Sequence, residues 1–224
     1  MLDIERIRSD TPGCKTKIHF NNAGSSLNPR CVTSAVIDYL DREQVIGSYE
    51  AAEESKNLVD NFYTNFSDLL NCDKSEISFI ENSTRAWELA IHSINWTTGD
   101  QIITGENEYG SNYLGLLHLA RQKSLRIVTA PTGSDGLISL NHVEQSINAR
   151  TKLIAVTHIA SQRGDIQPAP SIGEIARKHN VLFLLDACQS VGQINLDTQE
   201  INCDFLCGSG RKYLRGPRGT GFLF

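Results

Sequence analysis

Hydrophobic and polar positions along the chain follow two alternating patterns. Apolar residues at spacings of three and four, such as Leu58, Phe62 and Phe66, predict an amphipathic helix over residues 51–70. Other runs are short and almost wholly apolar. Residues 181–186 (VLFLLD) are the clearest case and predict a strand that is buried on both faces. The two patterns alternate to the end of the chain.

Two polar signals mark further helix starts. Asn28 followed by Pro29 predicts an N-cap and a first helical residue, for a helix that runs to about residue 45. Asn141, with Glu144 three residues later, resembles a capping box for a helix that ends near residue 147. The other predicted elements are helices over residues 84–94, 111–122 and 170–179, and strands over residues 76–80, 101–104, 126–130, 153–158, 203–208 and 219–224.

Near-continuous apolar strands separated by helices are typical of an α/β fold, with a mostly parallel sheet and helices on both faces. Ligands of such sheets bind outside the carboxyl ends of the strands. The residues that directly follow each strand are therefore the first candidates for chemistry.

Composition narrows the function classes. The 224 residues carry 21 basic and 26 acidic side chains, a formal net charge of −5, so we expect no nucleic-acid partner. No apolar run approaches the roughly 18–20 residues that cross a bilayer, and the N-terminus is charged, so we expect a soluble, cytoplasmic protein without membrane contact. The six cysteines form no C-x-x-C pair and predict free thiols and no metal site.

The first predicted strand is followed by Ser83 and Thr84, which lead directly into a helix. A helix N-terminus presents unpaired N–H groups and the positive end of the helix dipole, and the hydroxyls add donors. This combination suits an anion such as phosphate. Plain N-capping by Ser83 is the alternative.

The most apolar strand ends in Asp186. A buried carboxylate needs a partner, because desolvation alone would neutralise it. A salt bridge or a helix cap is the simple interpretation. Gln189 lies three residues further on and can both donate and accept hydrogen bonds near the same point. Cys188, between them, is interpreted as a packing residue.

The last loop, residues 209–221, contains four cations among glycines, Lys212 among them, and has no Walker A motif. A solvated turn is the alternative. Together, the three strand ends supply a helix start that suits phosphate, a carboxylate and a lysine. Pyridoxal 5′-phosphate (PLP) needs this set: an amine for the internal Schiff base, a carboxylate for the ring nitrogen and a helix N-terminus for the phosphate.

With these residues in this order, the chain resembles class V aminotransferase-type enzymes of PLP fold type I, the group that contains the cysteine desulfurases. Asp186-Ala187-Cys188-Gln189 followed by Ser209-Gly210-Arg211-Lys212 is the most specific part, and residues 19–24 and 216–221 also match. The resemblance implies an N-terminal arm and helix over residues 1–50 and a PLP-binding large domain over residues 51–224. It also implies a small C-terminal domain, which is absent here, so the chain looks C-terminally truncated.

The resemblance also implies residue roles. Lys212 would be the catalytic Schiff-base lysine, Asp186 would face the pyridine nitrogen and Gln189 the ring hydroxyl. Ser161 stands where desulfurases have a cofactor- or substrate-contacting asparagine. Further cofactor contacts would come from Ser83, Thr84 and Ser209 on the phosphate, from Tyr109 stacked on the ring, and from Arg211, whose guanidinium could clasp phosphate.

The implied function is a PLP-dependent reaction on an amino-acid substrate, most simply a C–S lyase or cysteine desulfurase-like cleavage through an external aldimine and a carbanion, in a homodimer. Residues 46–52 together with residues 210–219 resemble the C–S lyase of ergothioneine synthesis most closely. Two alternatives stay open. One is an aminotransferase, epimerase or decarboxylase with the same cofactor, and the other is a truncated, inactive remnant that only binds cofactor or dimerises.

Overall fold

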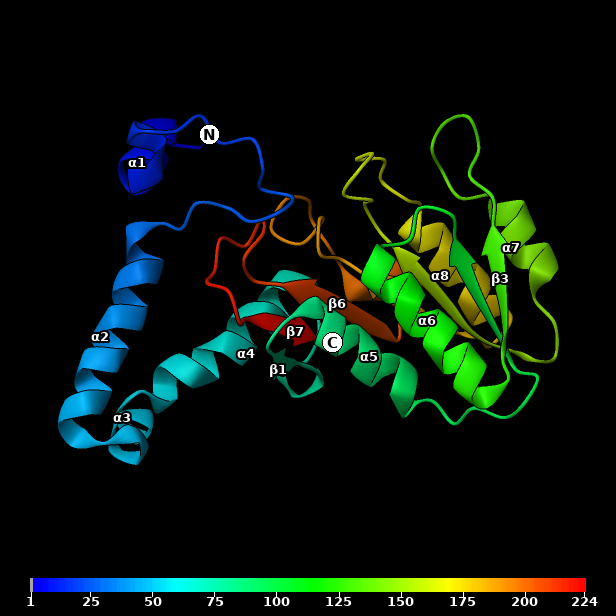
Figure 1. The fold of residues 1–224 in the computed structure, drawn as a ribbon, viewed down its shortest axis with the longest axis horizontal. Helices are drawn as coiled ribbons and strands as arrows, with labels where there is room; N and C mark the ends of the chain where they lie inside the picture. Colours follow the sequence, from blue (N-terminus) through cyan, green and yellow to red (C-terminus); the bar gives the residue numbers. More distant parts are fainter. Residues whose placement is uncertain (1) are drawn as a thin grey trace.

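The computed structural model describes residues 2–224, which form one seven-stranded sheet in the order β1-β7-β6-β5-β4-β2-β3 (Figure 1). β7 is antiparallel to both of its neighbours, and every other adjacent pair is parallel. The predicted mostly parallel sheet is therefore confirmed. The strands are β1 (Ser78–Ile80), β2 (Gln101–Gly105), β3 (Arg126–Ala130), β4 (Thr151–Thr157), β5 (Leu182–Asp186), β6 (Phe205–Ser209) and β7 (Gly221–Leu223).

Helices lie on both faces of the sheet, as predicted. The α-helices are α1 (Ile4–Ser9), α2 (Arg30–Ile46), α3 (Ser48–Glu54), α4 (Lys56–Leu70), α5 (Ser83–Ser93), α6 (Gly110–Lys123), α7 (Leu140–Ser146), α8 (Ala169–Lys178) and α9 (Thr198–Ile201). α5 and α6 contribute to one hydrophobic cluster, and α4, α7, α8 and α9 contribute to another. Within residues 2–224, no helix has the length and apolar character that a bilayer crossing requires.

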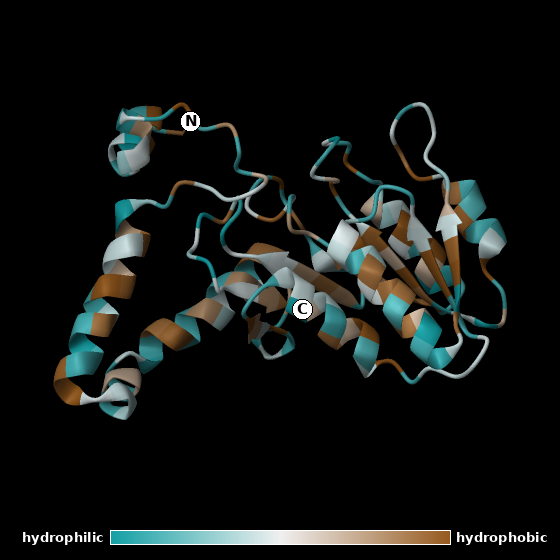
Figure 2. Ribbon diagram, viewed as in Figure 1, coloured by the Kyte–Doolittle hydropathy of each residue, from teal (hydrophilic) through white to brown (hydrophobic). Residues whose placement is uncertain are grey.

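Successive side chains of the central strands enter these two clusters in turn. Leu184 packs with α5 and α6, whereas Phe183 and Leu185 pack with the opposite cluster. Since side chains alternate across a strand, a strand covered on both faces must be apolar at every position. In Figure 2 the strands are largely brown, whereas the helices beside them alternate between brown and teal.

Three predicted boundaries were wrong. The helix over residues 51–70 is two helices, because Ser55 has non-helical backbone angles (φ −93°, ψ 3°) between α3 and α4. Pro29 has an extended backbone and is itself the N-cap of α2, so Asn28 does not cap that helix. The cap of α7 is Ser139, whose hydroxyl accepts the N–H of His142, two residues before the predicted cap.

The N-terminal segment extends away from the sheet, as the blue ribbon of Figure 1 shows, and neither α1 nor α2 has a buried residue. It returns to the body near residues 24–27. There the Ser26 N–H donates to the carbonyl of Arg211 (2.9 Å), and the Ser26 hydroxyl donates to the carbonyl of Lys212 (2.5 Å). The segment therefore contacts the loop that follows β6. The division into an arm over residues 1–50 and a domain over residues 51–224 stays a prediction.

Gly173 provides a test of the packing of α8. A Cβ at this position would lie 1.8 Å from the carbonyl oxygen of Ile201, a backbone atom at the end of α9. Because backbone cannot move aside as a flexible side chain can, we expect Gly173→Ala to lower the free energy of unfolding by about 2–3 kcal/mol in urea titrations. Gly110→Ala is the matched control, since nothing lies within 4 Å of its Cβ. Equal stability of the two variants would contradict this packing.

Candidate functional site

A cavity of about 320 Å³ lies at the carboxyl ends of β5 and β6, beside the N-terminus of α5. The structure brings seven of the eight predicted site residues to its wall. They are Ser83, Thr84, Tyr109, Asp186, Ser209, Arg211 and Lys212.

A larger cavity, of about 490 Å³, lies at the opposite ends of the same strands, lined by Arg177, Leu182 and Asp204 among others. It faces the amino ends of β5 and β6, where α/β sheets do not place their ligand sites. The candidate site is therefore the smaller cavity, which lies at the carboxyl ends and gathers the chemistry-bearing side chains.

Lys212 is buried, with 5% of its surface exposed. Its amine lies 5.5 Å from the centroid of the Tyr109 ring, and within residues 2–224 it makes no ion pair. The face of the Tyr109 ring can attract a cation, but it leaves the amine without a salt bridge. This amine is therefore free to react with a ligand in the cavity.

Asp186 is buried as well, with 2% exposed. One carboxylate oxygen accepts the side-chain amide of Asn112 (2.7 Å), and the other accepts the backbone N–H of Cys188 (2.8 Å). Both partners are neutral, so within the described residues the salt bridge considered from the sequence is not formed. The charge of Asp186 is held by dipoles alone and stays available to a cationic group in the cavity.

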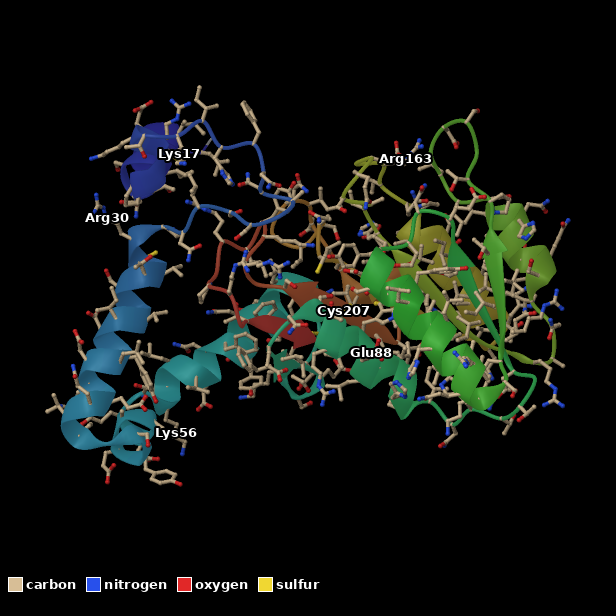
Figure 3. The ribbon with its side chains drawn as sticks, viewed as in Figure 1. Lys17, Arg30, Lys56, Glu88, Arg163 and Cys207 are labelled. Atoms are coloured by element: carbon tan, nitrogen blue, oxygen red, sulfur yellow. The ribbon has the colours of Figure 1, made fainter. Side chains whose placement is uncertain are left out.

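The N-terminus of α5 is capped by Asn82, whose side chain accepts the N–H of Arg85 (2.9 Å). The alternative of capping by Ser83 is therefore wrong. The Ser83 hydroxyl instead contacts the thiol of Cys207 (3.2 Å), and its N–H donates to the Ser209 hydroxyl (3.2 Å). Cys207, labelled in Figure 3, lies on β6 next to α5. Two hydroxyls and the positive end of a helix dipole thus meet at one corner of the cavity, which suits an anion.

Gln189 does not line this cavity. It lies in the wall of a neighbouring cavity of about 420 Å³, together with Ser161 and Tyr213. Its side-chain amide donates to the carbonyl of Ala23 (3.0 Å). Its side-chain oxygen Oε1 is buried and has no hydrogen-bond partner within residues 2–224. The predicted role of Gln189 toward a ring hydroxyl stays a prediction.

Cys188, interpreted from the sequence as a packing residue, is buried and also forms part of the cavity wall. Burial, and next the charge of Asp186, raise the pKa of its thiol to about 11, while the charge of Lys212 acts in the opposite direction. The charged groups of Lys212 and Asp186 therefore both lie close enough to affect the Cys188 thiol, although the two residues are 26 positions apart in the sequence.

The sequence analysis missed two residues that follow β2, Glu108 and Asn112. Asn112 donates to Glu108 (3.0 Å) with the same amide nitrogen that holds Asp186. Burial raises the pKa of Glu108 to about 7; the Thr157 hydroxyl opposes this rise, and the charge of Asp186 adds to it. The signal in the sequence was their position shortly after β2, because the residues that follow every strand of such a sheet are candidates and only three strand ends were considered.

The fold and the site have counterparts among known proteins. Residues 18–224 match the family described as aminotransferase class V. The chain belongs to the class V aminotransferase family. It is 29% identical over 227 residues to a probable cysteine desulfurase of Methanothermobacter thermautotrophicus, and 30% identical over 218 residues to the cysteine desulfurase IscS of Buchnera aphidicola. These alignments cover 100% and 94% of this chain but 56% and 54% of the two relatives.

Among solved structures, the apo cysteine desulfurase of Thermococcus onnurineus superposes with a TM-score of 0.91 at 27% identity. The alignment covers all of this chain and 57% of that one. Membership of the class V aminotransferases confirms the resemblance drawn from the sequence motifs, and the superposition confirms the predicted fold type. The chain spans about half the length of the relatives it matches.

The raised pKa of Glu108 predicts a pH dependence of stability. The unfolded chain loses this proton near pH 4.5 and the folded chain near pH 7, so ionisation costs free energy only in the folded state. We expect the free energy of unfolding to fall by about 2–3 kcal/mol between pH 5 and pH 8 through this group. Glu108→Gln should remove that fall in urea titrations of the cofactor-free protein.

Glu106→Gln is the matched control, because Glu106 is exposed on the same loop and accepts only the backbone N–H of Thr132. It should keep the wild-type change between the two pH values. If Glu108→Gln also keeps that change, the carboxyl is ionised at pH 5 and this description of its surroundings fails.

Proposed function

We propose that the protein is a PLP-dependent enzyme that acts on an amino-acid substrate and cleaves a carbon–sulfur bond. The observation that carries this proposal is the meeting of Lys212, Asp186 and the Ser83–Ser209 corner around one cavity. The relatives called cysteine desulfurases support the choice of a C–S bond. The sequence likeness to the lyase of ergothioneine synthesis stays a narrower prediction within the same proposal.

The donor set of the cavity fits PLP. A cavity of about 320 Å³ is within the range of small-molecule sites, and its wall offers the Lys212 amine, the buried Asp186 carboxylate and an anion corner. The three groups come from different elements: the loop after β6, the end of β5 and the start of α5. Beside the cavity, the side-chain oxygen Oε1 of Gln189 is a buried acceptor without a partner in the described residues.

PLP, when bound, supplies an aldehyde that condenses with amines and a ring that absorbs the electrons of a carbanion. Each neighbouring side chain has a definite task toward it. Lys212 would provide the amine for the covalent bond, and Tyr109 would provide an aromatic face for the ring. Asp186, whose hydrogen-bond donors in the described residues are both neutral, would keep the ring nitrogen protonated.

The anion corner would hold the phosphate. The hydroxyls of Ser83 and Ser209 lie at the N-terminus of α5, the positive end of its dipole. Thr84, whose hydroxyl is 3.2 Å from that of Ser111, lies in the same turn. Arg211 reaches the same cavity while its Nε donates to the carbonyl of Gly24 (3.3 Å), which leaves its terminal nitrogens for an anion.

The Lys212 amine is also the group placed to carry a proton at the substrate. Lys212 lines the cavity and its amine lies 5.5 Å from the Tyr109 ring centroid, so it is the lysine placed to take up a proton from a substrate there. With the cofactor bound, this amine would be the group in the cavity that removes and returns the α-proton of the substrate.

The proposal extends to partners and location. The substrate is a small amino acid, and we propose a homodimer as the active form, by likeness to the family. A cytoplasmic location is supported by the six cysteines, all free within the described chain, since free thiols are typical of a reducing compartment.

Cofactor binding is tested first by absorbance. Purified protein mixed with PLP should develop a band at about 400–430 nm, which is typical of a protonated Schiff base with lysine. Lys212→Ala should abolish this band. The matched control, Lys178→Ala, removes an exposed lysine paired with Glu144 and should leave the band unchanged. Wild-type protein that never develops the band would contradict the proposal.

The reaction is tested with a panel of amino acids, scored for sulfide, pyruvate and keto acid. We expect release of sulfide from cysteine-type substrates and none from Lys212→Ala protein. Keto acid without sulfide would instead identify an aminotransferase, which shares the first proton abstraction and differs in where the electrons go next. No turnover of any substrate would identify an inactive remnant of the family.

A further inference from the structure

Glu108 lies beside the candidate site, and none of the roles proposed above involves its carboxyl. Its carboxyl accepts five hydrogen bonds, from three different parts of the fold. The donors are the Tyr109 N–H (2.9 Å), the Asn112 amide (3.0 Å), the Thr157 N–H (2.9 Å), the Thr157 hydroxyl and, at 3.4 Å, the Thr104 hydroxyl.

Two of these donors lead directly to groups that would face the cofactor. The Tyr109 N–H fixes the backbone of the residue whose ring lies against the Lys212 amine. The Asn112 amide nitrogen uses its other hydrogen for Asp186 (2.7 Å). One carboxyl therefore holds both the aromatic face and, through Asn112, the carboxylate that faces the ring nitrogen.

The sheet adds a third connection. Thr157, which gives Glu108 both its N–H and its hydroxyl, ends β4 directly beside Asp186 at the end of β5. Glu108 thus joins the loop before α6 to the two central strands of the site. A neutral side chain of similar size at this position could accept some of these hydrogen bonds but could not carry the charge.

We propose that Glu108 is a positioning residue that sets the orientation and charge of Asp186 through the shared amide of Asn112 and holds the Tyr109 ring in place. Two carboxylates that share one amide repel each other, so protonation of Glu108 changes the field at Asp186. This inference rests on the proposed function, because it concerns how the site treats a bound pyridine ring. The experiments below give one result if this inference fails and a different result if the proposed function fails.

Three neighbouring groups, His158, Cys188 and Cys207, do not account for a change near pH 7. Burial lowers the pKa of His158 to about 4, and its ring pairs with Ser190 instead (3.0 Å). Burial raises the pKa of Cys188 to about 11 and also raises the pKa of Cys207 well above its ordinary value. The remaining groups are Asp186 on β5, Tyr109 in the same loop and Lys212 across the cavity.

The first experiment titrates the absorbance of the PLP-loaded protein between pH 5.5 and 8.5. Wild type should show a spectral step near pH 7, and Glu108→Gln should lose it, whereas Glu106→Gln should keep it. Thr157→Val removes the hydroxyl that favours the ionised carboxyl and should move the step to higher pH. A merely structural role would not move the midpoint. An unchanged step in Glu108→Gln protein overturns the inference.

The second experiment needs no cofactor. A double-mutant cycle combines Glu108→Gln with Asp186→Asn at pH 8, measured by urea unfolding. We expect the folding equilibrium constants to depart from additivity by at least about fivefold, because either substitution alone removes the repulsion. The pair Glu106→Gln and Asp186→Asn should be additive. Additivity in both pairs overturns the inference, whereas loaded wild-type protein without any band would overturn the proposed function alone.

Discussion

The buried charge of Asp186 is the constraint on which the architecture of the site depends. A carboxylate with 2% exposure survives only where donors replace its lost water, and here the donors are an amide on α6 and an N–H in the turn after β5. The first turn of α6 must therefore lie against the carboxyl end of β5. The loop that precedes α6 carries Glu108 and Tyr109, so the same requirement places an aromatic face and a second carboxyl beside the cavity.

Close approach of backbone on the other side of the cavity depends on small residues. A Cβ at Gly208 would lie 2.5 Å from the Phe222 ring, and one at Gly221 would lie 2.7 Å from the carbonyl of Gly208 and 3.1 Å from Asn82. Glycine at these positions lets β7 insert between β1 and β6 and brings the start of α5 against the end of β6. The contact between Ser83 and Ser209 follows from that approach.

Much of the fold could be predicted from the sequence, because the buried strands carry a local signal that needs no partner to be recognised. The VLFLLD run indicates a strand that is covered on both faces, and β5 has that place in the structure. The helix ends were less predictable, since a cap is decided by backbone angles at one residue. Ser55 breaks a helix within a pattern that is apolar at regular spacing on both sides.

The sequence alone determined the fold class, the family and most of the cavity wall, because these depend on residue type and on order along the chain. Tertiary structure alone decided that Asp186 has neutral partners, that Gln189 lies in the neighbouring cavity, and that Asn112 serves two carboxyls at once. The physical reason is that hydrogen-bond partners come from segments far apart in sequence, 74 positions in the case of Asn112 and Asp186. Which donor reaches a buried charge is settled only when the strands and helices pack.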